Sequence, residues 1–395
     1  MLIGIVGKAN VGKSTFFKAV TLAEVLIANY PFATIKANHG IGYVRVDCAE
    51  KHFKVKCNPR EGFCINGQRF VPVELLDVAG LVPGAHEGRG LGNQFLDDLS
   101  SADLLIHVVD MAGTTDSEGR PTTGHDPCLD IKFLEEELDF WYLRILKKIW
   151  KTFIRKLEVE HTDFVKTIAK QFSGLKVTEE MIRDVLKKLG INLEKEIASK
   201  WTEQRLFEFT RELRIRSKPM IIAANKADKE SFKENLEKAK NQFPDTLIIP
   251  CSAESELALR EATKAELIEY IPGDSNFKIL KELEEKKQKG LEFMQKFLDK
   301  FKSTGVQDVL NKSVFDFLKY IYIFPGGMTK LADSKGNILP DCFLLPPGST
   351  ALDFAYKLHT DFGDNFIKAM DVKKKIPIGK DHVLKSGDVV EIMAR

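Results

Sequence analysis

The chain lacks the features of secreted and membrane proteins. Its 395 residues contain no apolar run that approaches the length of a membrane span. The apolar opening from Leu2 to Val6 ends at Gly7, too soon for the apolar region of a signal peptide. Six cysteines are scattered along the chain without a Cys-x-x-Cys pair. We therefore expect a cytoplasmic protein with no membrane partner.

An excess of charge of one sign is also missing. Lys and Arg number 59 against 57 for Asp and Glu, for a net charge of +2. The charge of the whole chain therefore favours neither nucleic acid nor a membrane surface, and any basic surface must be local. There are no internal repeats, and the length is too great for one hydrophobic core, so we expect two or three domains.

Three of the cysteines lie close together in the sequence. Cys48, Cys57 and Cys64, with His52 between them, are near enough to suggest zinc. Their spacing matches no common zinc-ligand pattern, however. Reduced thiols are the interpretation that we favour.

Short apolar runs alternate with helical stretches. Lys13–Thr21 has helical spacing, and five apolar runs read as buried strands: Leu2–Val6, Val71–Leu76, Leu104–Val109, Pro219–Ala224 and Leu247–Pro250. This alternation predicts an α/β fold with a mostly parallel sheet that is covered on both faces.

Two long helical segments interrupt this alternation. Residues 129–215 carry no strand signal, and their apolar residues recur at helical spacing. We interpret them as a helical, coiled-coil-like insertion into the sheet domain. Residues 254–304 form a second charged stretch, rich in Lys and Glu, which we also predict to be helical. An amphipathic helix that begins near Gly305 then closes this domain.

The tail from residue 320 to 395 changes character and predicts a small α+β domain. Tyr320–Phe324 resembles a strand, and Lys335–Asn337 marks a turn. Thr350 and Asp353 have the spacing of a capping box for a helix at Ala351–His359. Short strands are expected at Val383-Leu384 and Val389–Ile392.

A complete phosphate-binding loop, Gly7–Ser14, lies between the first strand and the first helix. Its glycines let backbone N–H groups converge on phosphate oxygens, and the helix N-terminus adds a partial positive charge. Lys13 is expected to reach the β- and γ-phosphates, and the Ser14 hydroxyl to ligate Mg²⁺. The predicted contacts of the loop are Asn10, Val11, Gly12, Lys13, Ser14 and Thr15.

Asp77-Val78-Ala79-Gly80 follows a predicted buried strand. Alone, Asp-x-x-Gly is a common turn, but its position after a strand favours a functional role once a phosphate loop is present. The Asp77 carboxylate can hold Mg²⁺ through water, and the Gly80 amide can meet the γ-phosphate.

Asn225-Lys226-Ala227-Asp228 follows another apolar strand and predicts a guanine-reading site. The Asp228 carboxylate can accept two hydrogen bonds from guanine, which adenine cannot supply. Asn225 is expected to brace the loop, and the stem of Lys226 to lie on the base. Ser252 and Ala253 follow the last strand, where the Ala253 N–H can contact the guanine oxygen.

With these motifs assembled, the chain resembles the YchF subfamily of the Obg-like GTPases. Asn29–Thr34 is similar to the switch I signature of that subfamily, and Asp77–Asn93 to an extended Obg-type switch II. The tail, with Leu345–Thr350 and Ser386–Val390, resembles a TGS domain, a β-grasp module. Drg-type relatives, which also carry a TGS tail, are the nearest alternative.

The resemblance implies a domain order and further site residues. We predict a G domain in two parts, 1–128 and 216–319, with the helical insertion 129–215 between them and a TGS domain at 320–395. The resemblance makes Thr34 the switch I threonine, which completes the Mg²⁺ shell. The predicted catalytic residues are Lys13, Thr34 and Gly80, and the predicted metal ligands are Ser14, Thr34 and Asp77.

The predicted reaction is a slow hydrolysis of GTP. Several YchF-type proteins lose the Asn-Lys-x-Asp box and favour ATP, but Asn225 and Asp228 are both present here. Leu81 stands where Ras-like enzymes place a water-orienting glutamine. A potassium ion held by Asn10 is one way to supply the missing charge stabilisation, and a purely structural role for Asn10 is the alternative. His86 and Arg89 stay outside the predicted site.

The predicted partner is a ribosome or a structured RNA, because related proteins use the TGS module in that setting. Two basic groups, in residues 147–156 and 211–218, support this only loosely, since such charges usually lie on a solvated helix face. Trp141 and Trp150 are expected to be packing residues. The alternatives to a GTP-driven switch are an ATP-hydrolysing relative and a nucleotide-ordered scaffold with little turnover. We expect a monomer.

Overall fold

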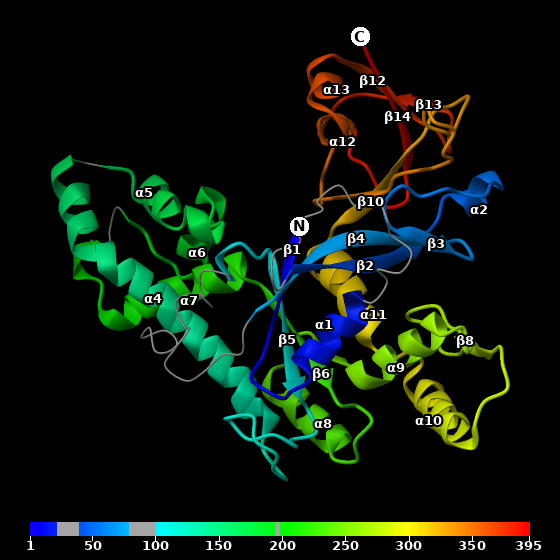
Figure 1. Ribbon diagram of the computed structural model, residues 1–395. Coiled ribbons are helices and arrows are strands. Elements are labelled where there is room, and N and C mark those ends of the chain that lie inside the picture. The colour runs from blue at the N-terminus through cyan, green and yellow to red at the C-terminus, as the bar shows by residue number, and fades with distance from the viewer. Residues whose placement is uncertain (22–38, 79–98, 161, 194–197) are drawn as a thin grey trace. The chain divides into compact units, whose positions relative to one another are not determined.

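A computed structural model describes residues 1–21, 39–78, 99–160, 162–193 and 198–395 (Figure 1). The chain divides into two compact units, each assembled from separate stretches of sequence. The first unit comprises Met1–Phe17, Asn38–Gly40 and Glu74–Glu254, and the second unit comprises Lys18–Ala37, Ile41–Val73 and Ser255–Arg395.

A seven-stranded sheet has the order β2-β4-β1-β5-β6-β7, with β3 (Phe63–Ile65) paired to β4 at its side. Strand β2 is His39–Asp47, and β4 is Gln68–Asp77. The strands within the first unit are β1 (Leu2–Val6), β5 (Leu104–Asp110), β6 (Met220–Asn225) and β7 (Ile248–Pro250). All of them pair in parallel, as do β1 and the end of β4. Every residue of β5 is buried, as expected for a parallel strand with both faces covered. The predicted α/β class is confirmed.

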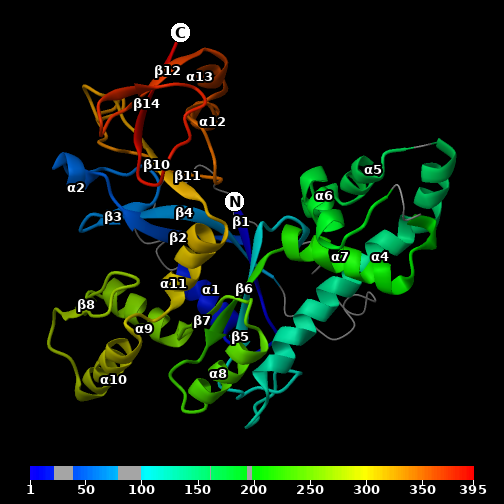
Figure 2. The ribbon, with the colours of Figure 1, turned by 180° about the vertical axis from the view of Figure 1, so that it is seen from behind.

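Helices of the first unit interrupt the sheet between β5 and β6. The long helix α4 (Pro127–Glu160) opens with a proline, whose missing N–H is no loss at a helix start. It packs against α7 (Glu203–Ser217), which in turn contacts α6 (Glu179–Lys188), and α6 contacts α5 (Phe164–Gln171). Figures 1 and 2 show these shorter helices gathered along α4.

The packing of these helices shows the role of the tryptophans. Trp141 is 5% exposed and belongs to the core that α4 shares with the sheet and with α5, α6 and α7. Trp150 stacks on Trp201 at a ring distance of 5.5 Å. Both are packing residues, as predicted. No helix in the described part of the chain is long and apolar enough to cross a membrane.

Strands and helices of the second unit include several elements that the sequence did not reveal. They are the part of β2 (His39–Asp47) within it, α2 (Glu50–Phe53) and β3 (Phe63–Ile65), whereas β4 (Gln68–Asp77) contains the predicted strand Val71–Leu76. The predicted helical stretch 254–304 is wrong in its middle. It consists of α9 (Ala253–Lys264), a hairpin of β8 (Ile268–Glu269) and β9 (Lys278–Ile279), and α10 (Glu285–Phe301). The hairpin is short because Pro272 and Gly273 lie between its strands.

The closing helix α11 (Val306–Asn311) continues into a π-helical turn at Lys312–Phe317. The tail then forms a five-stranded sheet of order β11-β10-β14-β12-β13. Its strands are β10 (Ile321–Pro325), β11 (Phe343–Leu345), β12 (Phe366–Asp371), β13 (Ile376–Ile378) and β14 (Val389–Ala394).

Two helices accompany this sheet, α12 (Ala351–Leu358) and α13 (Thr360–Asp364). The predicted capping box is confirmed: Thr350 accepts from the Asp353 amide, and Asp353 accepts from the Thr350 amide. Residues 383–384 form no strand, and Val383 makes only an isolated bridge with Thr350.

Helix α8 (Phe232–Gln242) belongs to the first unit and contacts α4.

Candidate functional site

The phosphate loop joins β1 to α1 (Lys13–Thr21) with a tight backbone path. Gly12 has a φ of 94°, and Asn10 is left-handed at 61°. The Phe16 amide donates to the Gly12 carbonyl at 2.8 Å, which fixes the first turn of α1. The loop therefore ends at a helix N-terminus, where free N–H groups and the helix dipole favour an anion.

Lys13 and Asp77 lie together at the carboxyl edge of the sheet. Ile5 of β1 pairs with Asp77 of β4, so the end of β4 lies beside the start of the phosphate loop. The Lys13 ammonium donates to the Asp77 carboxylate, and their side chains are only 12% and 20% exposed. Ser14, the next residue, is exposed. A carboxylate and a hydroxyl thus lie at one edge of the sheet, and such oxygen donors fit Mg²⁺.

Asn225 links the phosphate loop to the predicted guanine box. It lies at the end of β6 and is 3% exposed. Its side-chain amide donates to the Val11 carbonyl at 2.9 Å, and its side-chain oxygen accepts from the Ala253 amide at 3.0 Å. A Cβ atom added to Gly12 would lie 2.3 Å from the Asn225 amide nitrogen, so only glycine fits at position 12. One buried side chain therefore holds three of the sequence motifs in place.

Lys226 and Asp228 have different partners in the structure. The Lys226 ammonium donates to Asp110 at 2.9 Å and to the Asn10 carbonyl at 3.3 Å, so it reaches the phosphate loop itself. The Asp228 carboxylate accepts from the Ser252 hydroxyl at 3.0 Å, and its side chain is 11% exposed. The structure thus brings together the two boxes on which the prediction of guanine recognition depends.

A segment that sequence reasoning missed braces the phosphate loop from the other side. Residues 110–126 follow β5, and the side-chain amide of Asn10 donates to the Gly119 carbonyl at 2.9 Å. A Cβ atom on Gly119 would lie 2.7 Å from the Ala9 carbonyl oxygen, which explains the glycine. Lys8 donates to the Thr115 carbonyl at 3.0 Å and pairs with Asp130 at 2.7 Å.

Asp110 anchors this segment and is itself fully buried. Burial pushes the pKa of its carboxyl up, but hydrogen bonds from Lys226, Thr114 and Thr115 outweigh that effect and hold the pKa below its usual value. The signal for Asp110 was available, since a carboxylate directly after a fully apolar strand needs partners. Thr114 and Thr115 lie close to it in the sequence, but its charged partner Lys226 lies 116 residues away and could not be assigned to it.

Some predicted residues lie outside the described part of the chain. These are two of the predicted catalytic residues, Thr34 and Gly80, together with Leu81, His86 and Arg89. Their roles stay predictions.

The two basic groups of the helical segment separate in the structure. Lys148, Lys151, Arg155 and Lys156 are exposed on α4. In the second group, Arg214 is 4% exposed and pairs with Asp139 at 2.7 Å, and the buried Lys218 donates to two backbone carbonyls. The second group therefore does not form one basic surface.

Three families match successive parts of the chain. Residues 2–137 match the 50S ribosome-binding GTPases, residues 223–326 match the G4 motif-containing domain of Obg-like, YGR210-like GTPases, and residues 320–394 match the TGS domain.

Individual relatives agree with these matches. The chain is 48% identical over 396 residues to the "Uncharacterized GTP-binding protein MJ1332" of Methanocaldococcus jannaschii, covering 100% of this chain and 99% of the relative. It is 28% identical to the "Ribosome-binding ATPase YchF" of Buchnera aphidicola, covering 99% of this chain and 98% of that protein. The crystal structure of a GTP-binding protein from Pyrococcus horikoshii aligns with a TM-score of 0.79 at 38% identity, covering 100% of both chains.

The fold and the phosphate loop define a P-loop nucleotide-binding protein of the GTPase class. Within that class, the chain belongs to the YchF-type Obg-like GTPases with a C-terminal TGS domain. The resemblance drawn from the motifs is confirmed.

Proposed function

We propose that the protein binds GTP in preference to ATP and hydrolyses it slowly to GDP and phosphate. The observation that carries the proposal is the position of Asn225, which bonds both Val11 of the phosphate loop and the backbone of Ala253. The residues that we expect to contact the phosphates and the base thereby belong to one hydrogen-bonded assembly. Asn10, Val11, Gly12, Lys13, Ser14 and Thr15 would surround the phosphates.

Guanine selection would come from Asp228. A carboxylate accepts hydrogen bonds from the ring N–H and the amino group of guanine, and adenine offers neither at those positions. A site that depends on such bonds rejects the analogue that lacks them, because its own polar groups are left unpaired. Ser252 already orients the carboxylate from its other side.

Lys13, Ser14 and Asp77 would serve the reacting phosphates. Lys13 would neutralise charge on the β- and γ-phosphates, and it carries an ion pair with Asp77 that nucleotide must replace. Ser14, Asp77 and Thr34 would hold Mg²⁺, which offsets phosphate charge when bound, and the Gly80 amide would contact the γ-phosphate. Leu81 cannot orient water as a glutamine does, so we expect low intrinsic turnover.

A potassium ion at Asn10 is a further part of this proposal. The amide nitrogen of Asn10 is engaged by the Gly119 carbonyl. That bond orients the side chain of Asn10 beside the loop. The side-chain oxygen of Asn10 would then be the ligand for the cation. Equal single-turnover rates in potassium and in sodium would remove this part alone.

An exchange of base specificity tests the proposal most directly. We expect an Asp228→Asn protein to lose at least about 100-fold in GTP affinity, because an amide nitrogen then faces the guanine amino group. The same protein should gain affinity for xanthosine triphosphate, which carries an oxygen at that position. Isothermal titration with GTP, ATP and XTP in the presence of Mg²⁺ measures both effects.

The matched control is Asp245→Asn, which changes the same group on the surface of the same unit. Its affinities should equal those of the unchanged protein. Equal binding of GTP and ATP by the unchanged protein would refute guanine selection.

Hydrolysis of ATP is the second candidate. The Buchnera relative is named an ATPase, although it is only 28% identical. ATP binding at least as tight as GTP binding would favour this candidate. A third candidate is a scaffold that nucleotide merely orders, and a Lys13→Ala protein that still binds its partner would favour it.

The partner that we propose is the ribosome or a structured RNA. The name of the Buchnera relative and the ribosome-binding description of the matched GTPase family support this. The exposed lysines and arginines of α4 offer charge suited to phosphate backbones. Co-sedimentation with ribosomes in the presence of GTP and of GDP tests the proposal, and equal, weak pelleting in both states would contradict it.

A further inference from the structure

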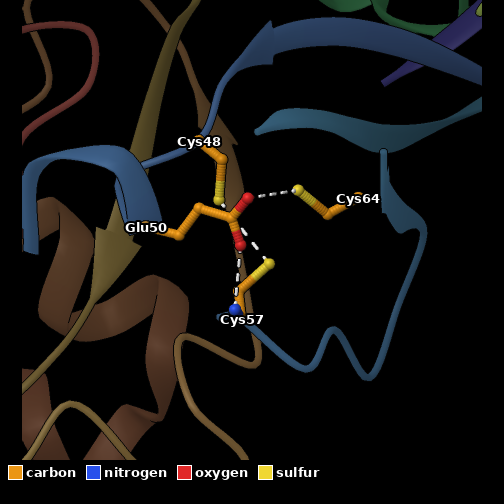
Figure 3. A group of neighbouring side chains, drawn as sticks. All are labelled: Cys48, Glu50, Cys57 and Cys64. Carbon is orange, nitrogen blue, oxygen red and sulfur yellow. Dashed lines mark hydrogen bonds between the residues drawn. The ribbon is translucent and has the colours of Figure 1, made fainter. Parts of the chain in front are cut away.

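Three thiols and a carboxylate converge in the second unit, whereas the described residues of the nucleotide site belong to the first unit. The sulfurs of Cys48, Cys57 and Cys64 and a carboxylate oxygen of Glu50 all lie within 4.8 Å of one another. Figure 3 shows the carboxylate of Glu50 between Cys57 and Cys64, with the Cys48 sulfur beside it. All four residues fall within the stretch Ile41–Val73 of one compact unit.

These residues come from four successive pieces of local structure. Cys48 directly follows β2, Glu50 is the first residue of α2, Cys57 lies in the irregular stretch after that helix, and Cys64 is in the middle of β3. We call residues 48–64 the cysteine loop. Between α2 and β3 its backbone has no regular structure, and the Asn58 and Arg60 amides donate to the Ile338 and Pro340 carbonyls at 2.8 and 2.9 Å.

Two distances within the cluster are close to those of a tetrahedral zinc site. The sulfurs of Cys48 and Cys57 are 3.7 Å apart, and the Cys64 sulfur lies 3.5 Å from a carboxylate oxygen of Glu50. Bonds of about 2.3 Å to sulfur and about 2.1 Å to oxygen place two sulfurs about 3.8 Å apart, and a sulfur and an oxygen about 3.6 Å apart. The observed sulfur separation is far longer than the bond of about 2.05 Å in a disulfide.

Burial makes the cluster costly unless a cation binds there. Cys48 is 3% exposed and Cys57 is 8% exposed, in a core that includes Phe324 and Leu339. Glu50 and Cys64 are only partly buried, but a carboxylate beside the buried Cys48 and Cys57 still calls for a positive partner. Arg69 supplies only part of it: its side chain is fully buried, but its guanidinium donates to the Leu339 and Pro340 carbonyls, and its Nε has no hydrogen-bond partner among the described residues.

Glu50 is held in place as a metal ligand would be. Its second carboxylate oxygen accepts from the Cys57 amide at 2.9 Å, so the carboxylate is oriented by the chain that it faces. Such a bond to the backbone is the kind of outer contact that positions a ligating carboxylate. His52, which the sequence placed with the cysteines, is exposed and lies edge-on against Phe53, so it is not part of the cluster.

We propose that Cys48, Glu50, Cys57 and Cys64 bind a structural zinc ion. Four protein ligands close the coordination sphere and leave no position for a substrate, so the site is structural and not catalytic. Thiolate-rich sites select zinc over magnesium or calcium. The ion would tie the irregular part of the cysteine loop to both β2 and β3. This proposal departs from the interpretation of these cysteines as reduced thiols, which rested on sequence spacing alone.

Metal content of the full-length, untagged protein is the first test. We expect roughly one zinc per chain by inductively coupled plasma mass spectrometry after dialysis under reducing conditions. Replacement by cobalt should produce the thiolate charge-transfer band and the intense visible bands of tetrahedral cobalt. A protein that takes up neither metal, or one that contains iron, overturns the proposal. So does a Cys48–Cys57 disulfide in protein alkylated at lysis.

Matched cysteine variants locate the site. Cys57→Ala should lose zinc, whereas Cys342→Ala should keep it, because Cys342 packs against the same core without joining the cluster. Cys128→Ala changes a buried cysteine of the first unit and is a second control that should keep the zinc. Zinc retained at full occupancy in Cys57→Ala would refute the assignment.

A milder variant covers the case in which Cys57→Ala does not fold. Glu50→Gln keeps the three thiols and the size of the side chain but weakens the oxygen ligand. We expect its zinc affinity, measured by competition with a chromophoric chelator, to fall at least tenfold, with the thiolate-to-cobalt band retained. Unchanged zinc affinity in this variant would remove Glu50 from the site and refute the four-ligand assignment.

Discussion

The phosphate loop and the cysteine loop are both shaped by a few side chains, but they differ in how the sequence presents them. The phosphate loop keeps its motif within the consecutive residues Gly7–Ser14, so it can be read without a fold. The cysteine loop has its four polar groups at positions 48, 50, 57 and 64, and this spacing matches no common ligand pattern. The groups come together only when β2, α2 and β3 are folded. Motif reading therefore finds sites that are contiguous and misses those that folding assembles.

The contrast has a limit, because the phosphate loop also depends on a distant residue. Asn225 donates to the Val11 carbonyl across 214 positions of sequence and lies against Gly12. The motif thus identifies the loop in the sequence, whereas a buried side chain from β6 stabilises its conformation. Substitutions at and around these contacts test how far the phosphate loop depends on distant residues.

The largest effect is expected from Gly12→Ala. Position 12 has a φ of 94°, and the added Cβ would lie 2.3 Å from the Asn225 amide nitrogen. Displacing Asn225 breaks its bonds to Val11 and Ala253. We expect nucleotide affinity to fall at least about 100-fold, or about 2.7 kcal/mol, in a titration with GTP.

Gly124→Ala is the matched control for that experiment. Gly124 also has a positive φ, 76°, but an added Cβ would meet no atom within 4 Å. Its nucleotide affinity should be unchanged. If the Gly12→Ala protein bound GTP as tightly as this control, the phosphate loop would not depend on Asn225. The phosphate loop would then be a purely local motif.

A smaller effect, on stability, is expected at His107, a residue whose protonation state is set by its burial in the fold. It lies in β5 and is 3% exposed. Burial first, and the nearby Lys8 second, lower the pKa of its imidazole from 6.5 to about 3. The unfolded chain therefore binds a proton that the folded chain refuses, so stability is lost as the pH falls below 6.5.

Between pH 7 and pH 5, this single group should lower the free energy of unfolding by about 2 kcal/mol. Urea unfolding at the two pH values, compared between the protein and a His107→Leu variant, isolates the contribution. The variant should lose less stability on acidification by that amount. Equal losses in the two proteins would contradict the buried, neutral state of His107.

The smallest effect is expected at Thr350, where the local sequence was sufficient to predict the helix cap. Its hydroxyl accepts from the Asp353 amide as the N-cap of α12. Thr350→Ala should cost about 1 kcal/mol of stability, measured by urea unfolding, whereas Thr350→Ser should keep most of it. Equal losses in both variants would assign the effect to packing and not to the cap.

The success of prediction from sequence follows the same division. The strands whose residues are mostly apolar were found, and β1 has the predicted limits Leu2–Val6. β2 was missed because Gly40, Gly42 and charged residues interrupt its apolar run, although the strand is held by pairing in the sheet. A charged stretch read as one helix contains the β8–β9 hairpin instead, because Pro272 and Gly273 break it.

The candidate site shows the same pattern. Lys13, Asp77 and Asn225 were predicted, and the structure places them along the carboxyl edge of one sheet. Asp110 and Gly119 were not predicted, since each acts through contacts with residues more than a hundred positions away. No local pattern carries such information.

The division of the chain into interleaved units has a consequence for its synthesis. The cysteine loop leaves the ribosome early, but the residues that complete its core, Phe324, Leu339, Val372 and Val389, are among the last to be made. At about 5–20 residues per second, the loop waits for roughly 15 to 60 seconds with its apolar residues and thiols uncovered. A metal ion captured during that interval would hold the nascent loop together before its core exists.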